Sequence, residues 1–238
     1  MINFKLLYTS ILFKFLCIVF LFMLDGFQLV FAKESTITDD MVLIPGGVFN
    51  RGCNRFGPQH GAPEQKVHLN PFWIDKFEVT NEKFEKLFPD HFLRRSILSD
   101  CDNCPVSKLN WYEAADYCHL IGKSLPSEAQ WERAAGNGNG CEFPWGEGFD
   151  LMNPLARGGL KSNEKTSQVG SFPANSNGVH DMAGNVWEWV ADWFSVNFYY
   201  TEILHNPRGP TRGVMKVRRG GSWADSVIAM TSGYRDWS

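Results

Sequence analysis

The chain has 238 residues, of which 44% are apolar, 21% charged and 14% aromatic, with a formal net charge of −3. This content is enough for one large domain or two small ones. It excludes a disordered chain, a collagen-like chain and a disulfide mini-scaffold. Lys and Arg form no cluster, so the electrostatic footprint of a nucleic-acid-binding protein is missing. No nucleic-acid partner is therefore expected.

The first 32 residues differ in composition from the rest of the chain, because 24 of them are apolar. An apolar run at 15–24 follows Lys14, and small Ala32 closes the segment. This order predicts a secretory signal peptide over 1–32, followed by a polar lead-in at 33–40. An uncleaved anchor is the alternative, since the segment is long enough to span a bilayer, but its internal charges favour cleavage. The mature chain is expected to be exported, to a periplasm, the extracellular space or a secretory lumen, with no membrane attachment.

Five cysteines remain after the signal segment: Cys53, Cys101, Cys104, Cys118 and Cys141. In an oxidising compartment they are disulfide candidates. Their odd number means that at least one is free, pairs with another chain or has lost its partner. Cys101 and Cys104 form a C-x-x-C without the second ligand pair that zinc needs, and Pro105 follows at once. We expect a local disulfide or two simple thiols there.

Regular elements are expected mainly in the first half of the mature chain. Strand-like runs lie at 41–44, 48–50, 66–69, 72–74 and 214–218. Helices are predicted after the capping residues Thr80, Asn110 and Ser127. The buried face of the second helix is expected to carry Trp111, Ala114, Ala115, Cys118 and Ile121. Residues 136–180 show almost no regular pattern, and a connection of that length is usually functional or held by something such as a bound ion.

The motifs of common enzymes are missing, but one segment suits a cation. Neither a phosphate-binding glycine loop, nor an H-E-x-x-H pair, nor a G-x-S-x-G serine occurs in the sequence. Asp181 and Glu188 flank a glycine-containing elbow, and calcium takes oxygen ligands from carboxylates and main-chain carbonyls. The spacing is not that of an EF-hand, so simple turn capping is the competing interpretation.

Five motifs in a fixed order carry a family resemblance. They are Glu78–Asn81 (EVTN), Gly122–Glu132 (GKSLPSEAQWE), Phe143–Gly146 (FPWG), Asp181–Trp189 (DMAGNVWEW) and Arg219–Trp223 (RGGSW). In this order they resemble the formylglycine-generating enzyme, or sulfatase-modifying factor, family, from about Met41 to the C-terminus. The resemblance implies an α+β fold over 41–238, a single irregular domain related to C-type lectins and poor in regular secondary structure.

The resemblance also implies a calcium site at the elbow. Its ligands would be the side chains of Asp181 and Glu188 and the carbonyls of Gly184 and Val186. A second family calcium site would draw on 153–172, where no acidic ligand clearly matches, so that site stays open.

The family's catalytic pair is missing from the expected positions. Active members carry two copper-binding cysteines three and eight residues after the serine of the Gly-Gly-Ser segment, and use oxygen to convert a sulfatase cysteine to formylglycine. Counted from Ser222, these positions hold Asp225 and Met230. Cu(I) selects thiolates, so copper is not expected here. Ser222 and Trp223 remain as candidates for a substrate cleft.

The chain end is a second departure from the family. Members continue past the region of Tyr234 to a closing segment, often with a cysteine that bonds the counterpart of Cys118. Here the sequence stops at Ser238. The missing partner would explain the odd cysteine count, and it suggests a truncated sequence or a domain with an open edge.

Three hypotheses about function follow. The favoured one is an exported, calcium-stabilised domain that binds a peptide, glycan or protein partner, with a sulfatase as one candidate, and that is not itself a copper oxidase. The second is a formylglycine-generating oxidase in which another thiol replaces the missing pair. The third is an iron-dependent or maturation enzyme of the same fold, for which the histidine spacing gives no support.

Overall fold

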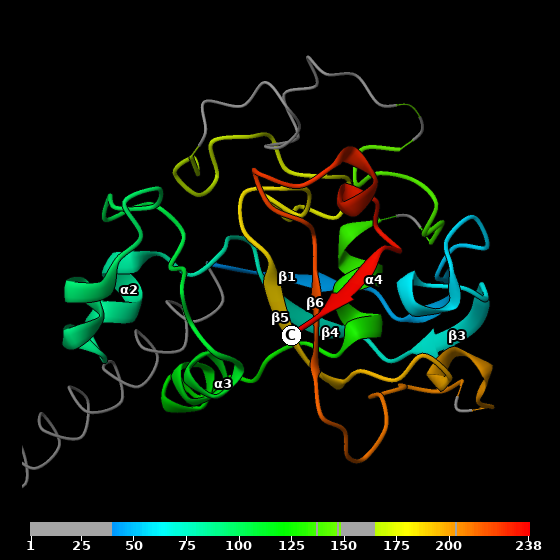
Figure 1. Cartoon of the computed structure of the whole chain (residues 1–238). Coiled ribbons are helices and arrows are strands. Elements are labelled where there is room, and N and C mark those ends of the chain that lie inside the picture. The colour runs from blue at the N-terminus through cyan, green and yellow to red at the C-terminus, as the bar shows by residue number, and fades with distance from the viewer. Residues whose placement is uncertain (1–39, 137, 147, 149–164, 203) are drawn as a thin grey trace, which may run out of the picture. The chain divides into compact units, whose positions relative to one another are not determined.

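Seven short strands and three α-helices make up most of the regular structure of the described residues (Figure 1). The computed structural model describes residues 40–136, 138–146, 148, 165–202 and 204–238. The signal peptide predicted over 1–32 and nearly all of the lead-in at 33–40 lie outside them. None of the helices described is both long and apolar enough to cross a bilayer.

The elements follow one another in the order β1–β4, α2–α4 and β5–β7. The strands are β1 (Met41–Ile44), β2 (Gly47–Arg51), β3 (Gln65–Leu69), β4 (Phe72–Asp75), β5 (Glu188–Trp193), β6 (Lys216–Arg219) and β7 (Arg235–Trp237). The α-helices are α2 (Asn81–Glu85), α3 (Trp111–Leu120) and α4 (Glu128–Ala135). The 3₁₀ turns are η1 (Pro58–His60), η2 (Pro89–Arg94), η3 (Phe198–Tyr200) and η4 (Val227–Met230).

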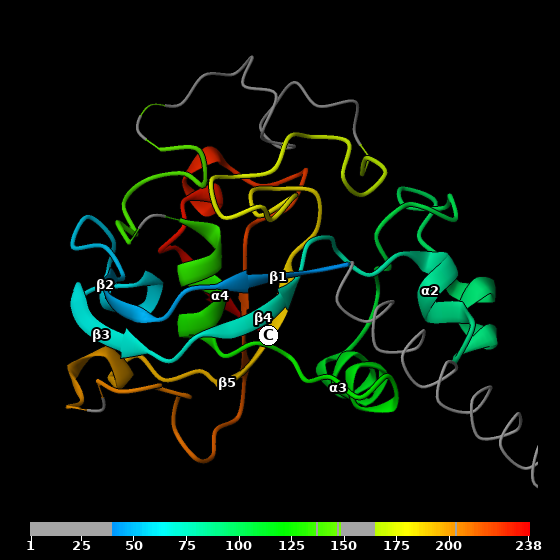
Figure 2. The ribbon, with the colours of Figure 1, turned by 180° about the vertical axis from the view of Figure 1, so that it is seen from behind.

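Three small sheets hold these strands. β1 pairs with β4, β2 pairs with β3, and β5, β6 and β7 form the third sheet. The last two sheets are antiparallel, with Phe49 opposite Val67 and Glu188 opposite Arg219. Seen from behind, β1 and β4 run side by side across α4 (Figure 2). The expected α+β fold with little regular secondary structure is confirmed.

Helix α4 forms the centre of the core. Trp131, Ala134 and Ala135 are at most 1% exposed. They pack with a cluster drawn from β1, β5, β6 and the loop before β5, which contains Ile44, Val179, Met182, Val190 and Val217. A second cluster joins Ala129 of the same helix to Phe49, Val67 and Leu69 of the β2–β3 sheet.

Local capping signals set the helix starts as predicted. At the start of α3, the Asn110 side chain accepts a hydrogen bond from the Glu113 amide, and the Glu113 side chain accepts one from the Asn110 amide. This reciprocal pair is a capping box, and Ser127 and Gln130 form another at the start of α4. Thr80 caps α2 through the Lys83 amide.

Two expectations about the elements were wrong. On α3 the buried side chain is Tyr117, which lies against the ring of Phe84, whereas Ile121 is 37% exposed because it follows the last helical residue. The strand expected at 214–218 begins only at Lys216, where pairing starts, and Val214 is 93% exposed. Strands β5 and β7 were not foreseen.

Candidate functional site

The elbow predicted to bind calcium is a loop of strained backbone leading into β5. Asp181 and Asn185 adopt positive φ angles of 59° and 63°, a region that L-residues other than Asn and Asp rarely enter. Asn185 is fully buried. Its side chain accepts from the Ser167 amide at 2.9 Å and donates to Glu78 Oε2 at 2.5 Å. The elbow is thus tied to two segments distant in sequence.

Three carboxylates meet at this elbow. Asp181 is 5% exposed; its Oδ2 accepts from the Gly170 amide at 2.6 Å, whereas its buried Oδ1 has no hydrogen-bond partner. Glu188 Oε2 accepts from the indole of Trp131 at 2.9 Å. Glu78 is the third acid, and sequence analysis did not single it out although it belongs to the EVTN motif. None of the three acids forms an ion pair with another described residue.

Burial shifts the protonation of all three acids. Burial raises the pKa of Glu188 to about 7, and the charge of Asp181 adds to this. Burial, followed by repulsion from Asp181 and Glu188, raises the pKa of Glu78 well above its usual value. Burial also raises the pKa of Asp181. An uncompensated group of this kind favours binding of either protons or a cation.

The donor set fits a hard cation. Calcium prefers carboxylate and carbonyl oxygens, and no described residue donates a hydrogen bond to the carbonyl of Gly184 or of Val186. No group of three or more His, Cys, Asp or Glu side chains with metal-holding geometry exists among the described residues. The predicted set is of another kind, with two carboxylate side chains, one of which offers the open Oδ1 of Asp181, and two main-chain carbonyls. The possible second site at 153–172 falls mostly outside the described residues.

The Arg-Gly-Gly-Ser-Trp segment is attached directly to this elbow. The Gly184 amide donates to the Gly220 carbonyl at 2.8 Å, and the Trp223 amide donates to the Asn185 carbonyl at 3.1 Å. The φ of Gly220 is +92°, and a Cβ there would meet the ring of Trp131 at 3.2 Å. The elbow therefore fixes the position of Ser222 and the residues after it.

Asp225 and Met230, at the family's cysteine positions, have separate environments. Asp225 is partly buried, and its Oδ2 accepts from Ser222 Oγ and, at 2.8 Å, from Trp187 Nε1. The Trp187 ring in turn lies under the guanidinium of Arg218, 4.9 Å from its centre. Met230 ends η4 and is fully buried. Asp225 and Ser222 are brought together, while Met230 is part of the core.

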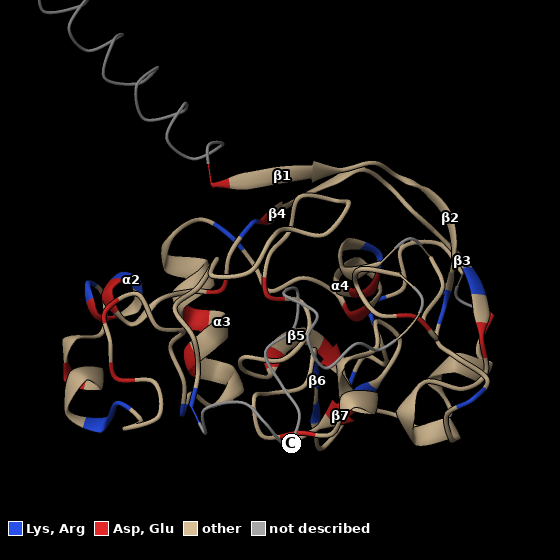
Figure 3. Cartoon of the chain, turned by 90° about the horizontal axis from the view of Figure 1, so that it is seen from above, with Lys and Arg blue, Asp and Glu red and all other residues tan. Residues whose placement is uncertain are grey.

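A buried network of ion pairs connects the start of the Arg-Gly-Gly-Ser-Trp segment to helix α4. Sequence analysis did not predict this network. Arg235 binds Glu128 through two hydrogen bonds of 2.8 Å, and Arg219 binds Glu132 at 2.5 Å. All four residues are at most 2% exposed. Burial raises the pKa of Glu132, while the charge of Arg219 opposes that rise. Figure 3 marks the acidic residues of α4 in red and the basic residues of β6 in blue.

Two disulfides form among the described cysteines. Cys53 pairs with Cys141, and Cys101 pairs with Cys104 in the local bond that was one of the expected outcomes. Cys118 is free. Burial raises the pKa of the Cys118 thiol to about 11, so it stays protonated at neutral pH.

Comparison with known proteins identifies the family. The sequence model of the family described as "Sulfatase-modifying factor enzyme 1-like domain" matches residues 26–238. The formylglycine-generating enzyme of Mus musculus is 30% identical over 245 residues, covering 77% of this chain and 66% of the relative. The formylglycine-generating enzyme of Thermomonospora curvata is 29% identical, with 80% and 84% covered.

Another relative is much longer than this chain. "Serine/threonine-protein kinase Pkn1" of Chlamydia trachomatis serovar L2 is 35% identical over 216 residues, covering 80% of this chain but only 34% of the relative. The chain thus spans about a third of that relative's length.

Solved structures share the fold. "Treponema denticola variable protein 1" has a TM-score of 0.70 at 24% identity, with 83% of this chain and 88% of that chain covered. PvdO from Pseudomonas aeruginosa has a TM-score of 0.69 at 25% identity, with 83% and 87% covered. From these matches and the motif geometry, the chain belongs to the sulfatase-modifying factor enzyme 1-like family.

Proposed function

We propose that this chain is an exported, calcium-stabilised domain that binds a peptide, glycan or protein partner around Ser222 and Trp223, and that it does not act as a copper oxidase. One observation carries the proposal: a hydrogen-bonded carboxylate, Asp225, and a buried thioether, Met230, occupy the two positions at which active relatives hold cysteine. A partner-binding role needs the surface around Ser222, whereas an oxidase role needs the missing thiols.

The chemistry of the two side chains argues against a Cu(I) centre. Cu(I) prefers soft thiolates, whereas an aspartate is a hard oxygen ligand and a single thioether binds weakly. The described thiol that is not in a disulfide is Cys118, on α3, and its raised pKa leaves little thiolate at neutral pH. We therefore assign these positions to binding.

The surface around Asp225 suits a polar ligand. Both hydrogen bonds to the carboxylate reach Oδ2, so the second oxygen has none from a described residue and is available to a ligand donor. Arg218 and Asp236 form an ion pair beside the Trp187 ring, with Nη2 and Oδ2 2.6 Å apart. A flat aromatic ring next to fixed charges suits the amides of a peptide or the hydroxyl groups of a glycan.

We assign the elbow a structural calcium ion. The Asp181 and Glu188 side chains and the Gly184 and Val186 carbonyls would hold it, and its charge would offset the repulsion among three acids. The orphaned Asp181 Oδ1 supports this assignment. Since the elbow fixes the Gly-Gly-Ser segment, bound calcium would keep the partner-binding surface in place.

Export rests on two features. The N-terminal segment has the signal-peptide pattern, and two disulfides are typical of an oxidising compartment such as a periplasm, the extracellular space or a secretory lumen. We expect no membrane attachment after cleavage and no nucleic-acid partner.

Metal content and peptide turnover of the purified full chain test the proposal. Mass spectrometry would measure calcium, copper and iron, and a sulfatase-motif peptide would be incubated with the chain under oxygen. We expect bound calcium, no copper and no change in peptide mass. Formylglycine product with bound copper would establish the oxidase instead, and stoichiometric iron would support the third hypothesis.

A binding assay with the same peptide tests the surface. Asp225→Asn and Ser222→Ala are expected to weaken any measured affinity by about tenfold, the typical cost of losing a charged hydrogen bond. Ser226→Ala is the matched control, because this exposed residue lies on the same segment. Equal affinities for all variants would place the binding surface elsewhere.

A further inference from the structure

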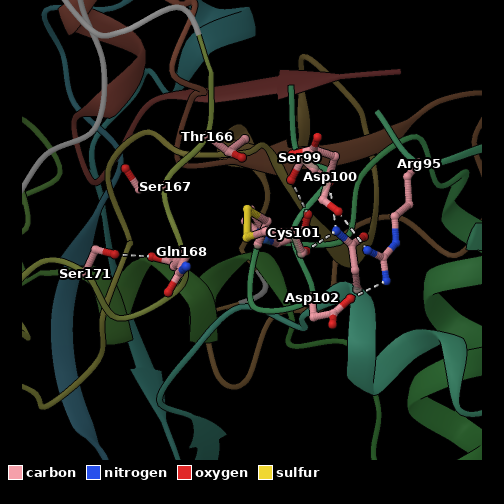
Figure 4. The surroundings of a disulfide bond; sticks show 12 residues. Arg95, Ser99, Asp100, Cys101, Asp102, Thr166, Ser167, Gln168 and Ser171 are labelled. Carbon is pink, nitrogen blue, oxygen red and sulfur yellow. Dashed lines mark hydrogen bonds and ion pairs between the residues drawn. A yellow bond between two sulfur atoms is a disulfide. The ribbon is translucent and has the colours of Figure 1, made fainter. Parts of the chain in front are cut away.

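The two disulfides differ in what they connect, although each joins a buried cysteine to a partly exposed one. Cys53 is fully buried, and its bond to Cys141 joins positions 88 residues apart. Cys101 and Cys104 are three residues apart. Cys101 is partly exposed whereas Cys104 is 7% exposed. The first bond joins two segments distant in sequence and ends at the partly exposed Cys141, while the second closes a short loop, whose surroundings Figure 4 shows.

Hydrogen bonds hold this short loop in place independently of its disulfide. The Cys104 amide donates to the Cys101 carbonyl at 3.1 Å. The Asn81 side chain donates to the carbonyls of Ser99 and Cys101 at 2.7 and 2.9 Å. The Cys104 carbonyl accepts from the Asn81 amide at 3.0 Å. These bonds involve main-chain atoms or Asn81, so they do not need the sulfur–sulfur bond.

Residues from two further segments, Arg95 and Val169, donate hydrogen bonds to the loop. Arg95 donates to the Asp100 carbonyl at 2.7 Å and to the Asp102 carboxylate at 2.9 Å (Figure 4). The Val169 amide donates to the Asn103 carbonyl at 3.0 Å. If the disulfide were reduced, the two thiols would therefore remain next to each other, which favours rapid closure of the pair.

We propose that Cys101–Cys104 is a thiol–disulfide exchange site whose substrates are accessible thiols of exported peptides or proteins. A substrate thiolate attacks Cys101 Sγ, the Cys101–Cys104 bond breaks, and Cys104 leaves as a thiolate that takes up a proton. A second substrate thiolate then attacks the mixed disulfide and releases Cys101. Two electrons and two protons pass from the substrate dithiol to the cysteine pair, and the substrate gains a disulfide.

The unequal exposure of Cys101 and Cys104 assigns their roles in the exchange. Attack needs access to the sulfur, so the partly exposed Cys101 receives the incoming thiolate. The buried Cys104 is shielded from a second external thiol and serves as the leaving and resolving residue. The site lies outside the Ser222 surface, so the proposal stands independently of partner binding there.

Single-cysteine variants of the full chain test these roles. In Cys104→Ser, Cys101 should form a mixed disulfide with oxidised glutathione about tenfold or more faster than Cys104 does in Cys101→Ser, because of its greater access. Peptide mass spectrometry identifies the cysteine that reacts. Equal rates, or faster reaction at Cys104, would overturn the assigned roles.

The unmodified chain tests the exchange itself. A peptide dithiol should reduce one disulfide per chain, at Cys101 and Cys104, and become oxidised in equal amount, while Cys53–Cys141 stays intact. Cys118→Ser should behave like the unmodified chain, and a Cys101→Ser/Cys104→Ser variant should not oxidise the peptide. Thermal unfolding would establish that the double variant is folded. If the peptide dithiol reduced the Cys101–Cys104 bond no faster than the Cys53–Cys141 bond, the proposal would be refuted.

Discussion

The indole of Trp187 donates a 2.8 Å hydrogen bond to the carboxylate of Asp225. Trp187 lies in the DMAGNVWEW motif, and Asp225 stands at one of the two positions where the family resemblance implies a cysteine. Ser222 donates to the same oxygen. Asp225 therefore presents a charged acceptor beside Ser222 and Trp187, and this arrangement leads to the first prediction.

Restoring the two cysteines is expected to restore copper binding. An Asp225→Cys/Met230→Cys variant should hold about one Cu(I) per chain, because two thiolates form the linear coordination that Cu(I) favours. Copper content after anaerobic loading checks this, with the unmodified chain and each single variant as controls. Since Met230 is fully buried, its replacement by the smaller cysteine should cost about 1 to 2 kcal/mol of stability. Equal copper in all four proteins would contradict the prediction.

Breaking the Glu128–Arg235 pair should strongly destabilise the fold. Glu128→Gln leaves the guanidinium of Arg235 buried without its counter-charge, which typically costs about 3 to 5 kcal/mol. Urea denaturation measures the loss. Glu82→Gln is the control, because the Glu82–Lys86 pair is exposed and such pairs contribute roughly 0.5 kcal/mol or less. Similar losses for both variants would show that the buried network does not anchor the segment.

A rise in pH should lower the stability of the calcium-free chain and should increase the stabilisation that calcium provides. Without calcium, the raised pKa of Glu188, about 7, means that the folded chain keeps a proton which the unfolded chain releases from its usual pKa near 4.5. The unfolding free energy should therefore fall as pH rises across that window, by on the order of 3 kcal/mol for this group. Calcium binds the ionised form, so its stabilising effect should grow from about pH 5 to about pH 8.

Thermal unfolding with calcium or with a chelator at several pH values measures both effects. Asp181→Asn should remove most of the calcium effect, since it weakens the ligand set while keeping the side-chain shape. Asp236→Asn, a partly buried acid outside the elbow, is the matched control. A calcium effect that does not depend on pH or on Asp181 would place the ion elsewhere.

The two disulfides should contribute unequally to stability. The bond between Cys53 and Cys141 closes a loop of 88 residues, so its removal should cost about 4 to 5 kcal/mol from the lost constraint on the unfolded chain. The Cys101–Cys104 bond spans three residues and should contribute only about 2 kcal/mol. Chemical denaturation of the paired Cys→Ser variants measures the two losses. If removal of the Cys101–Cys104 bond cost more stability than removal of the Cys53–Cys141 bond, this would contradict the interpretation that hydrogen bonds hold the Cys101–Cys104 loop.

Features that depend on residues close together in the sequence could be predicted without the structure. The capping pairs at Asn110 and Ser127 placed α3 and α4, and the five ordered motifs identified the family. That Asp225 and Met230 occupy the positions where the resemblance implies cysteines also needs only a count from Ser222.

The tertiary structure alone decided what depends on distant segments. β5 and β7 exist because they pair with β6, and such pairing leaves little trace in a run such as Glu188–Trp193. Glu78 joins the elbow across more than a hundred residues through Asn185. The choice of Cys141 as the partner of Cys53 has the same origin. Burial and charge pairing are properties of the packed chain, because a local pattern does not specify which remote side chain will lie opposite.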